Sequence, residues 1–345
     1  MQSNRYKEAG VDIDKKYDAV TRAKEAIRTT FTPGVLSDIG SFGGLFDPAK
    51  VGAGGEVLVA SADGVGTKIK IAIDSGVYDT VGQCLVNHCV NDILVQGARP
   101  LFFLDYVGVG KMEPDIVAKV LEGLAIACRE NGMALLGGET AEMPGFYKIG
   151  DFDLVGTIVG TVPAERILDG SRVHEGDVVL ALPSSGLHTN GYSLARKVLF
   201  EDCGYSLDHR PEGWTESLRD ALLAVHRSYL DPVLPLLTAG DEVHACAHIT
   251  GGGLYDNVPR VLPAGLRAEI RLDSISRPRI FDLLVEKGDI DQGEAHRVFN
   301  MGFGFLLIVD PSAASDILAR LREHGETEAA EVGRIVKGEK GVVLL

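Results

Sequence analysis

The sequence predicts a two-domain α/β (α+β) protein, and three observations lead to this prediction. The chain has 345 residues, of which 45% are hydrophobic, so it is long enough for two domains that each bury a core. Short β-branched and apolar runs alternate with helical patterns along the chain, as they do in mixed architectures. A polar, turn-rich stretch at 169–176 separates two halves of similar size. We therefore predict domains at residues 1–170 and 171–345.

The apolar runs predict strands, and the helical patterns between them predict helices. Strands are expected at 57–62, 101–107, 152–162, 177–182, 266–272 and 303–309. Helices are expected at 80–96, 114–131 and 311–324. The second of these is the clearest, because Pro114 stands at its first turn, apolar residues form one stripe and Gly132 follows as the stop signal.

Charge and cysteine content exclude several classes of protein. The formal net charge of −15 argues against binding to a nucleic-acid backbone, so any phosphate site must be local. The five cysteines contain no CxxC pair, so neither a zinc site nor a disulfide framework is indicated. The sequence has no signal core and no apolar run of the roughly 18 to 20 residues that a membrane span needs. We therefore expect a cytoplasmic protein with reduced thiols and no membrane partner.

Glycines gather in clusters, which are places where the backbone turns sharply or lets a ligand approach. The stretch "DGVGTK" at 63–68 has neither the spacing of a P-loop nor the third glycine of a dinucleotide-binding loop. It does combine Asp63, flexible backbone at Gly64 and Gly66, the Thr67 hydroxyl and the Lys68 ammonium. This set offers a metal ligand together with phosphate donors. By itself, it is equally consistent with an Asp-Gly turn followed by a solvated lysine.

Several other acids stand at predicted element ends. Asp92 lies four residues after His88 in a helical pattern, so the two share a helix face, although Asp92 could also point to water. Asp105 closes an apolar run, and Glu139 and Glu142 follow a run that ends in two glycines. Carboxylates without cysteine or paired-histidine ligands favour a hard ion, so we predict Mg²⁺ and a phosphate-rich substrate.

Two loops in the second half read as strand, glycine loop, helix, an order that aims backbone N–H groups at a ligand. In "PSSGLHTNG", Ser185, Thr189 and Asn190 add side-chain donors, and His188 is a candidate general acid, general base or substrate donor. The alternative for His188 is a loop histidine packed against the helix.

The second of these loops, "HITGGGLYDN", places His248 before three successive glycines, Gly251, Gly252 and Gly253. A phosphate or ribose that approaches the backbone closely would explain these glycines. A bare chain reversal is the alternative.

Taken together and in order, these segments resemble the phosphoribosylformylglycinamidine cyclo-ligases, also called AIR synthetases. The resemblance covers residues 6–336 and rests on "YKEAGVDID", "DGVGTK", "VNDILVQGA", "PLFFLDY", "GGETAEMPG", "SSGLHTNGYSL", "HITGGGLYDNVPR" and "FNMGFG". It implies a homodimer whose N-terminal domains form a shared β-barrel, with a C-terminal α/β sandwich. It also implies a step of purine synthesis in which ATP drives closure of formylglycinamidine ribonucleotide to 5-aminoimidazole ribonucleotide, ADP and phosphate.

The resemblance also implies roles for individual residues. The ATP segment would comprise Gly64, Gly66, Thr67 and Lys68, with Lys24 covering the nucleotide. Metal ligands would be Asp63, Asp92 and Glu139, and catalytic roles would fall to Asp63, Lys68, His188 and His248. The substrate would contact Ser185, His188, Thr189, Asn190, Gly251, Gly252 and Gly253.

The chemistry of the implied reaction is consistent with these site residues. An amide oxygen is a poor leaving group, so ring closure needs a phosphorylated amide (iminophosphate) intermediate. Such chemistry depends on positioning and charge stabilisation rather than on a covalent nucleophile. Selenophosphate synthetase, thiamine-phosphate kinase and the related amidotransferase subunit share the scaffold, and a non-catalytic nucleotide-binding subunit is a further alternative. The first cysteine is Cys84, within a predicted helix, which disfavours the selenophosphate enzyme.

Overall fold

A five-stranded sheet forms the first half of the chain in the computed structural model, which describes residues 5–9, 21, 24, 27–38, 40–240 and 242–345. Its strands are β1 (Gly44–Phe46), β2 (Val57–Gly64), β3 (Arg99–Val109), β4 (Ala134–Glu142) and β5 (Phe152–Val162). Their order is β1-β2-β5-β3-β4, and only the β3–β4 pair is parallel. Residues 10–14 of the predicted N-terminal motif lie outside the described residues.

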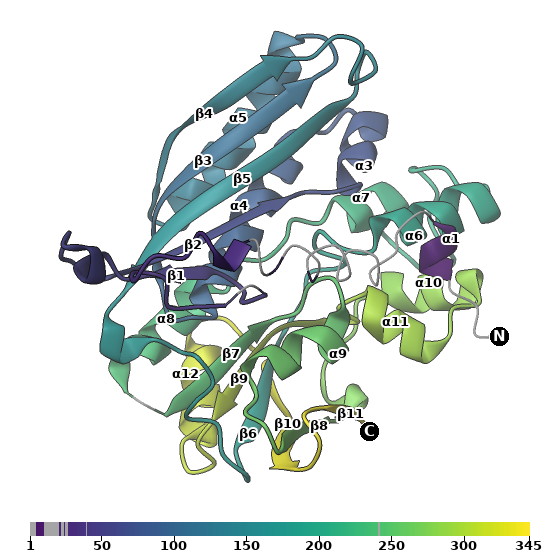
Figure 1. Cartoon of the computed structure of the whole chain (residues 1–345). Coiled ribbons are helices and arrows are strands. Elements are labelled where there is room, and N and C mark those ends of the chain that lie inside the picture. Colours follow the sequence, from purple (N-terminus) through teal and green to yellow (C-terminus); the bar gives the residue numbers. More distant parts are fainter. Residues whose placement is uncertain (1–4, 10–20, 22–23, 25–26, 39, 241) are drawn as a thin grey trace.

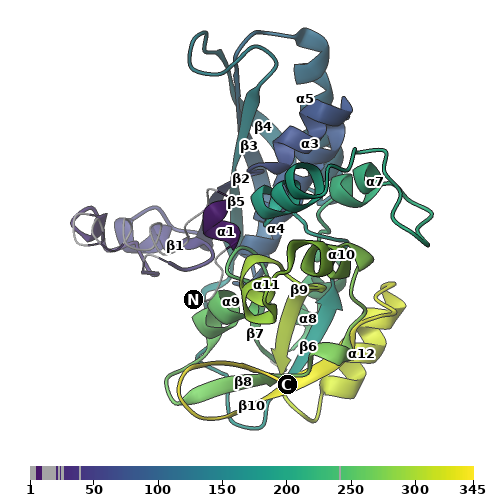
Figure 2. The ribbon, with the colours of Figure 1, turned by 90° about the vertical axis from the view of Figure 1, so that its right-hand side faces the viewer.

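Helices α3 (Lys68–Ser75), α4 (Asp79–Leu94) and α5 (Pro114–Glu130) lie on one side of this sheet (Figure 2). Helix α4 packs on β5 and β2, and α5 packs on α4. The two helices can approach closely because Gly123 has no side chain. A Cβ at this position would lie 1.9 Å from the Asp79 carbonyl oxygen. Apolar side chains such as Leu104 and Leu136 remain exposed in this half.

A six-stranded sheet forms the second half (Figure 1). Its strands are β6 (Val178–Pro183), β7 (Val243–His248), β8 (Leu266–Ile270), β9 (Phe303–Val309), β10 (Ala330–Lys337) and β11 (Gly341–Leu344). Their order is β11-β8-β10-β6-β9-β7, with β11 and β8 parallel and the other pairs antiparallel. Every residue of β6 and β9 is buried, which fits the continuous apolar runs of these two strands.

Among the described residues, the remaining helices either pack in the core of the second sheet or form a separate apolar cluster that reaches the first half. They are α1 (Arg5–Glu8), α6 (Tyr192–Arg196), α7 (Leu218–Leu223), α8 (Leu230–Ala239), α9 (Gly253–Asn257), α10 (Arg279–Gly288), α11 (Gln292–Val298) and α12 (Ala314–Glu323). Short 3-10 or π turns are η1 (Pro48–Val51), η2 (Ala164–Arg166), η3 (Lys197–Asp202), η4 (Val258–Val261) and η5 (Leu272–Ser274). Ile71 of α3 belongs to the same apolar cluster as Leu222 of α7 and Phe281 of α10, so apolar packing crosses between the halves.

The mixed α/β class is confirmed. Strands β5 and β9 have the predicted bounds, and α4 and α5 lie within two residues of theirs. Strand β8 ends two residues early, because Leu272 already belongs to η5. The predicted domain border at 170/171 falls in the connection between β5 and β6, and it stays a prediction.

Two further features concern the thiols and the helix lengths. All five cysteines are free, and four of them are buried. Among the described residues, no helix combines the length and the hydropathy needed to cross a membrane.

Candidate active site

Helix α4 carries a buried polar face into the junction between the two halves, and its amides hold a loop of the second half. Asn87 Nδ2 donates to the His226 carbonyl oxygen at 2.8 Å, and Asn91 Nδ2 donates to the Arg227 carbonyl oxygen at 2.7 Å. Asn91 Oδ1 in turn accepts from the Tyr229 backbone N–H at 2.9 Å. The four-residue spacing of the two amides therefore fixes the segment 226–229 against the first half.

The next pair on the same helix face, His88 and Asp92, starts two arms of a hydrogen-bonded network. In the first arm, His88 Nε2 lies 2.8 Å from Asp63 Oδ2 at the end of β2. The other ring nitrogen, Nδ1, lies 2.6 Å from the Thr189 hydroxyl in the loop after β6. His88 thus links a carboxylate of the first half to a loop of the second.

In the second arm, Asp92 Oδ1 lies 2.9 Å from His248 Nδ1 at the end of β7. A carboxylate oxygen accepts, so His248 donates from Nδ1 and its Nε2 is left as an acceptor. His248 Nε2 lies 3.0 Å from His226 Nε2, and His226 Nδ1 lies 3.4 Å from the Thr189 hydroxyl. The two arms meet at Thr189, so one network joins Asp63 to Asp92. Asp92 is therefore buried in the junction and does not point to water.

His188 is fully enclosed beside this network. Its ring stacks on His226 with centroids 3.9 Å apart, and its backbone has a φ of 60°, an uncommon value for a side-chain-bearing residue. Nε2 accepts from the Ser185 N–H at 3.2 Å, so the neutral ring carries its proton on Nδ1. Nδ1 is buried and has no hydrogen-bond partner within the part of the chain that is described.

Burial keeps these imidazoles uncharged. It holds the pKa of His188 and of His226 well below the usual range, and the neighbouring cationic groups act in the same direction. Burial also lowers the pKa of His248, although its hydrogen bond to Asp92 opposes this effect. At neutral pH, His188 is therefore a hydrogen-bond donor or a proton acceptor, and not an imidazolium acid.

Two of the predicted metal ligands converge, and the third does not. Asp63 Oδ2 and Asp92 Oδ2 lie 2.8 Å and 3.7 Å from the same His88 nitrogen, so His88 lies between the two carboxylates. Glu139 follows Gly138, which is aligned with Asp63 across β5 and β3. The Glu139 side chain therefore projects from the face of the sheet opposite to that of Asp63. The strand that carries it, β4, lies three strand spacings, or roughly 14 Å, from Asp63. Within one chain, Glu139 does not join Asp63 and Asp92.

Lys68 has a different environment from the one expected of a phosphate ligand. Its side chain is completely buried at the start of α3. The ammonium donates to the His188 carbonyl oxygen at 3.0 Å, the Ala224 carbonyl oxygen at 2.6 Å and Cys84 Sγ at 3.1 Å. These contacts use all three of its protons, so this conformation offers none to a phosphate.

The other residues of the predicted nucleotide segment lie at the junction or on the surface. The Gly64 N–H binds Asp63 Oδ1 at 2.7 Å, and Gly66 has a φ of 64° that favours glycine. The Thr67 hydroxyl lies 3.0 Å from the Ser193 hydroxyl of α6. Lys24 forms an ion pair of 2.9 Å with Asp38, a residue that was not predicted to contact it.

The two substrate loops of the second half lie side by side. A Cβ at Gly251 would be 3.0 Å from Asn190 Oδ1, so the glycine loop contacts the loop that carries His188 and Thr189. Gly252 and Gly253 have φ values of 96° and 58°, which explains these two glycines by backbone conformation. The Ser185 hydroxyl is used by the protein itself, because it donates to the Val225 carbonyl oxygen at 2.6 Å.

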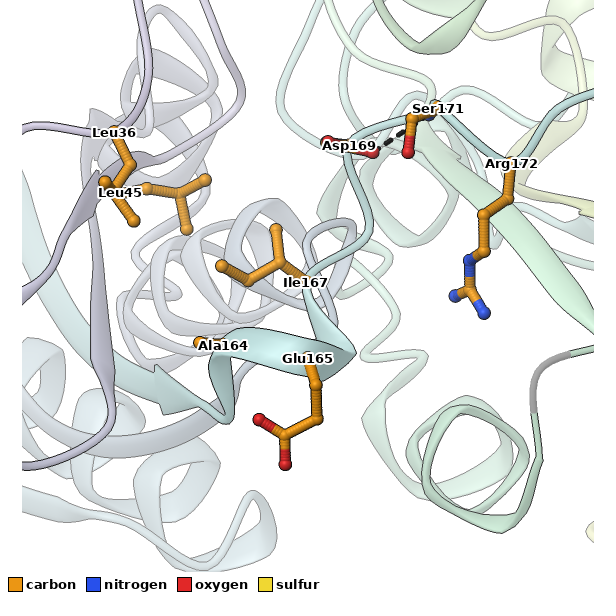
Figure 3. A pocket seen from close by; sticks show the side chains of 8 residues that line it. All are labelled: Leu36, Leu45, Ala164, Glu165, Ile167, Asp169, Ser171 and Arg172. Carbon is orange, nitrogen blue, oxygen red and sulfur yellow. Dashed lines mark hydrogen bonds between the residues drawn. The ribbon is translucent and has the colours of Figure 1, made fainter.

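A pocket of about 540 Å³ lies elsewhere, at the connection between the halves (Figure 3). Leu36 and Leu45 lie on one side of it, and Ile167 and Arg172 come from the segment after η2. None of its lining residues belongs to the histidine network.

Sequence reasoning missed His226 and the role of the two amides. His226 stands in "LLAVHRSYL", where no motif or spacing distinguishes it. The signal that could have found it lies in α4, because asparagines four residues apart in an otherwise apolar helix need buried partners.

Comparison with known proteins assigns the family. The models of AIR synthase related proteins match both halves, the N-terminal domain at residues 46–162 and the C-terminal domain at 174–345. A phosphoribosylformylglycinamidine cyclo-ligase from Alkaliphilus metalliredigens is 46% identical over 98% of this chain and 97% of its own length. The chain belongs to the phosphoribosylformylglycinamidine cyclo-ligase family. A cyclo-ligase from Bacillus thuringiensis subsp. konkukian is 47% identical, over 97% of this chain and 96% of its own.

Solved structures confirm the fold of the family. The hydrogenase maturation protein HypE, solved in complex with ATP, matches with a TM-score of 0.61. The match covers 83% of this chain and 81% of HypE at 20% sequence identity, so it supports the fold alone.

Proposed function

We propose that this protein closes the imidazole ring of formylglycinamidine ribonucleotide, using ATP and releasing 5-aminoimidazole ribonucleotide, ADP and phosphate. Membership of the cyclo-ligase family over both halves of the chain carries the proposal. The junction adds physical support, because two carboxylates, a fully enclosed His188 and two ligand loops meet there.

Ring closure has to remove an amide oxygen, which is a poor leaving group. In the proposed reaction, this oxygen attacks the terminal phosphoryl group of ATP, and the bond to the leaving ADP breaks. The amide nitrogen loses its proton, which gives the phosphate ester called the iminophosphate. The amidine nitrogen then bonds to the activated carbon, phosphate leaves and the nitrogen loses a proton. Positioning and charge stabilisation suffice for such steps, and no covalent nucleophile is needed.

His188 fits the task of orienting the substrate. Its buried Nδ1–H has no acceptor among the described residues, and a buried donor without an acceptor costs about 1–3 kcal/mol. A substrate oxygen would supply the missing acceptor. We assign the same loop, with Thr189 and Asn190, and the glycines 251–253 to substrate binding, and His248 to proton transfer through its contact with His226.

Asp63 and Asp92 fit a hard divalent ion, because both offer carboxylate oxygens and both lie beside His88 at the junction. We propose that these two residues hold Mg²⁺, which would neutralise charge on the ATP phosphates. Gly64, Gly66 and Thr67 would contact the phosphates, and Lys24 would release Asp38 to cover the nucleotide.

For Lys68, we propose a positioning role instead of phosphate binding. Its ammonium holds the carbonyl groups of His188 and Ala224 together, so it fixes the loop that presents His188.

We also propose a homodimer in the cytoplasm. Leu104 and Leu136 are neighbours on β3 and β4 and are 37% and 63% exposed. Glu139 projects from the same face as Leu104, so a second copy placed there would meet both. The free cysteines fit a reducing compartment.

The deciding experiment is an assay of the purified protein for ATP-dependent formation of 5-aminoimidazole ribonucleotide. Asp63→Asn should lose roughly 10²- to 10³-fold in turnover and keep its circular dichroism spectrum, because an amide no longer neutralises the cation. His188→Ala should lose roughly 10²-fold or more. The control is His324→Ala, which changes a half-exposed histidine on the second half and should retain full activity.

Absence of product from the unsubstituted protein would overturn the proposed reaction. Near-normal turnover of Asp63→Asn would remove Asp63 from the metal site without changing the family assignment. An unchanged turnover of His188→Ala would remove this residue from substrate binding.

A further inference from the structure

A second histidine cluster lies away from the junction and consists of His174, Asp177 and His244. One potential ligand atom from each residue lies within 4.8 Å of the other two. His244 Nδ1 is 2.8 Å from Asp177 Oδ2, and the rings of His174 and His244 meet edge to face with centroids 5.6 Å apart. Neither the sequence motifs nor the proposed function uses these residues.

The second sheet builds this cluster from strand ends. Val309 of β9 pairs with Val178 of β6 on one side and with Val243 of β7 on the other. Asp177 directly precedes β6 and His244 directly follows Val243, so both stand at the same end of three adjacent strands. His244 lies on a paired strand and Asp177 directly precedes one, so both are held more rigidly than residues in the middle of a loop, which suits a metal site.

His174 reaches the cluster through a turn. Its backbone N–H donates to Asp177 Oδ2 at 2.9 Å, which folds the segment before β6 and places the imidazole beside the strand ends. His174 itself is exposed, whereas Asp177 is 3% exposed, so the cluster has a buried carboxylate and an open side. An ion could therefore enter without any rearrangement of the core.

The cluster lies far from the junction, because the strands run between the two sites. Strand β6 begins next to Asp177 and ends next to Ser184, and β7 begins next to His244 and ends at His248. Six residues of extended strand span roughly 17–20 Å. Events at the cluster can thus be measured separately from catalysis.

The spacing and the donor types fit a borderline divalent ion. Ligand atoms bound to zinc at about 2.0–2.1 Å stand roughly 3.3 Å apart in a tetrahedron, and two imidazoles on the same ion have ring centroids about 5 Å apart. Two nitrogens and a carboxylate favour Zn²⁺, Co²⁺ or Ni²⁺ over Mg²⁺, which prefers oxygen. Asp310, directly after β9, adds a nearby negative charge. Hydrogen bonds from Ser312 lower the pKa of Asp310 most, and the charges of His244 and His174 lower it further.

We propose that His174, Asp177 and His244 bind a divalent transition-metal ion of the zinc type, with solvent completing its coordination. The bound ion fastens the turn before β6 to the edge strand β7 and stabilises the second half. It is separate from the Mg²⁺ site assigned to Asp63 and Asp92.

The test is a titration of the metal-stripped, full-length protein with Zn²⁺ in excess Mg²⁺, followed by calorimetry and by thermal unfolding. His174→Ala removes an exposed ligand and leaves the backbone contact to Asp177 intact, so the protein should fold normally. We expect this variant to bind one Zn²⁺ fewer, or to bind that ion with an affinity reduced by more than roughly 100-fold. Loss of an outer-shell partner would reduce the affinity by only about 10- to 100-fold. The Zn²⁺-dependent rise in melting temperature should disappear in this variant, and His244→Asn should behave in the same way.

Two control variants separate this site from other binding. His324 lies 3.7 Å from Asp231, and the described residues add no third ligand to this histidine–aspartate pair, so His324→Ala should bind Zn²⁺ normally. His226→Gln tests the junction, where imidazoles are also closely spaced. The proposal fails if the unsubstituted protein binds no Zn²⁺, if His174→Ala binds it unchanged, or if His226→Gln abolishes the ion that His174→Ala was expected to lose. Turnover should be the same in His174→Ala and in the unsubstituted protein, whichever function the junction has.

Discussion

His296 of α11 provides a quantitative test of how burial controls acid stability. The residue is 2% exposed, and neither ring nitrogen has a hydrogen-bond partner in the described ranges. Burial lowers the pKa of His296 to about 4, and the charge of Arg277 adds to the effect. Because the ring is buried and has no hydrogen bonds to the described residues to compensate, protonation of His296 is unfavourable in the folded protein.

The direction of the pH effect follows from proton binding. In the unfolded chain, the ring has its ordinary pKa near 6.5, so below that pH the unfolded state binds a proton that the folded state does not. Stability is therefore complete above about pH 6.5 and falls as the pH drops towards 4. The whole shift corresponds to about 3 kcal/mol, and about 1.3 kcal/mol of this is lost by about pH 5.5.

The perturbation is His296→Leu, which replaces the ring by an apolar side chain. At about pH 7.5, the variant should unfold with the same free energy as the unsubstituted protein or with up to about 2 kcal/mol more, because two unsatisfied nitrogens are removed. Between about pH 7.5 and about pH 5.5, it should lose about 1.3 kcal/mol less than the unsubstituted protein. Urea unfolding followed by circular dichroism at both pH values measures the difference.

A matched control is His324→Gln, because the His324 side chain is 42% exposed in the folded chain, whereas that of His296 is buried. This variant should keep the pH dependence of the unsubstituted protein. If His296→Leu loses as much stability as the unsubstituted protein over the same pH interval, the ring is protonated or hydrogen-bonded in the folded state and the reasoning is refuted.

Two further predictions concern the proposed roles of Lys68 and Leu136. Lys68→Met should lower the free energy of unfolding by about 2–4 kcal/mol, because two buried carbonyl groups lose their donor. It should also lower turnover by displacing His188. Unchanged urea unfolding would contradict the buried contacts. Leu136→Asp should convert the proposed dimer into monomers in light scattering, because a carboxylate would be buried at the interface, whereas Val343→Asp on β11 should leave the mass unchanged. A monomeric unsubstituted protein would exclude the dimer.

The sequence predicted best those strands whose apolar residues form a long continuous or alternating run. Strand β9 is apolar except for one glycine, and β5 alternates in burial along most of its length, so both ranges were predicted without error. Strand β10 was not predicted because it carries three charged residues, and β11 was not predicted because it has only four residues. Helices α6 and α9 have five residues each and show no full helical period, so they were predicted only from the order strand, glycine loop, helix.

For the site, the residue types predicted which side chains gather at the junction. They did not predict the contacts that each of these side chains makes. Asp63 and Asp92 were predicted as metal ligands, which stays a prediction, and in the structure both carboxylates contact His88 Nε2. Lys68 was predicted to bind phosphate, yet tertiary packing encloses its ammonium between two loops. A local motif cannot reveal such a contact, because the carbonyl groups that bind Lys68 come from residues 188 and 224.

The polar face of α4 explains why the site lies where the two halves meet. An apolar face there would pack without orienting the loops, whereas Asn87 and Asn91 bind specific backbone groups of residues 226–229 and so fix their position. One turn of the same helix then presents His88 and Asp92 to Thr189 and His248. Because the amides and the titratable groups share one rigid helix, a shift of the second half that broke the amide contacts would also separate the carboxylates from the histidines. The contacts that hold the halves together therefore also set the geometry proposed for catalysis.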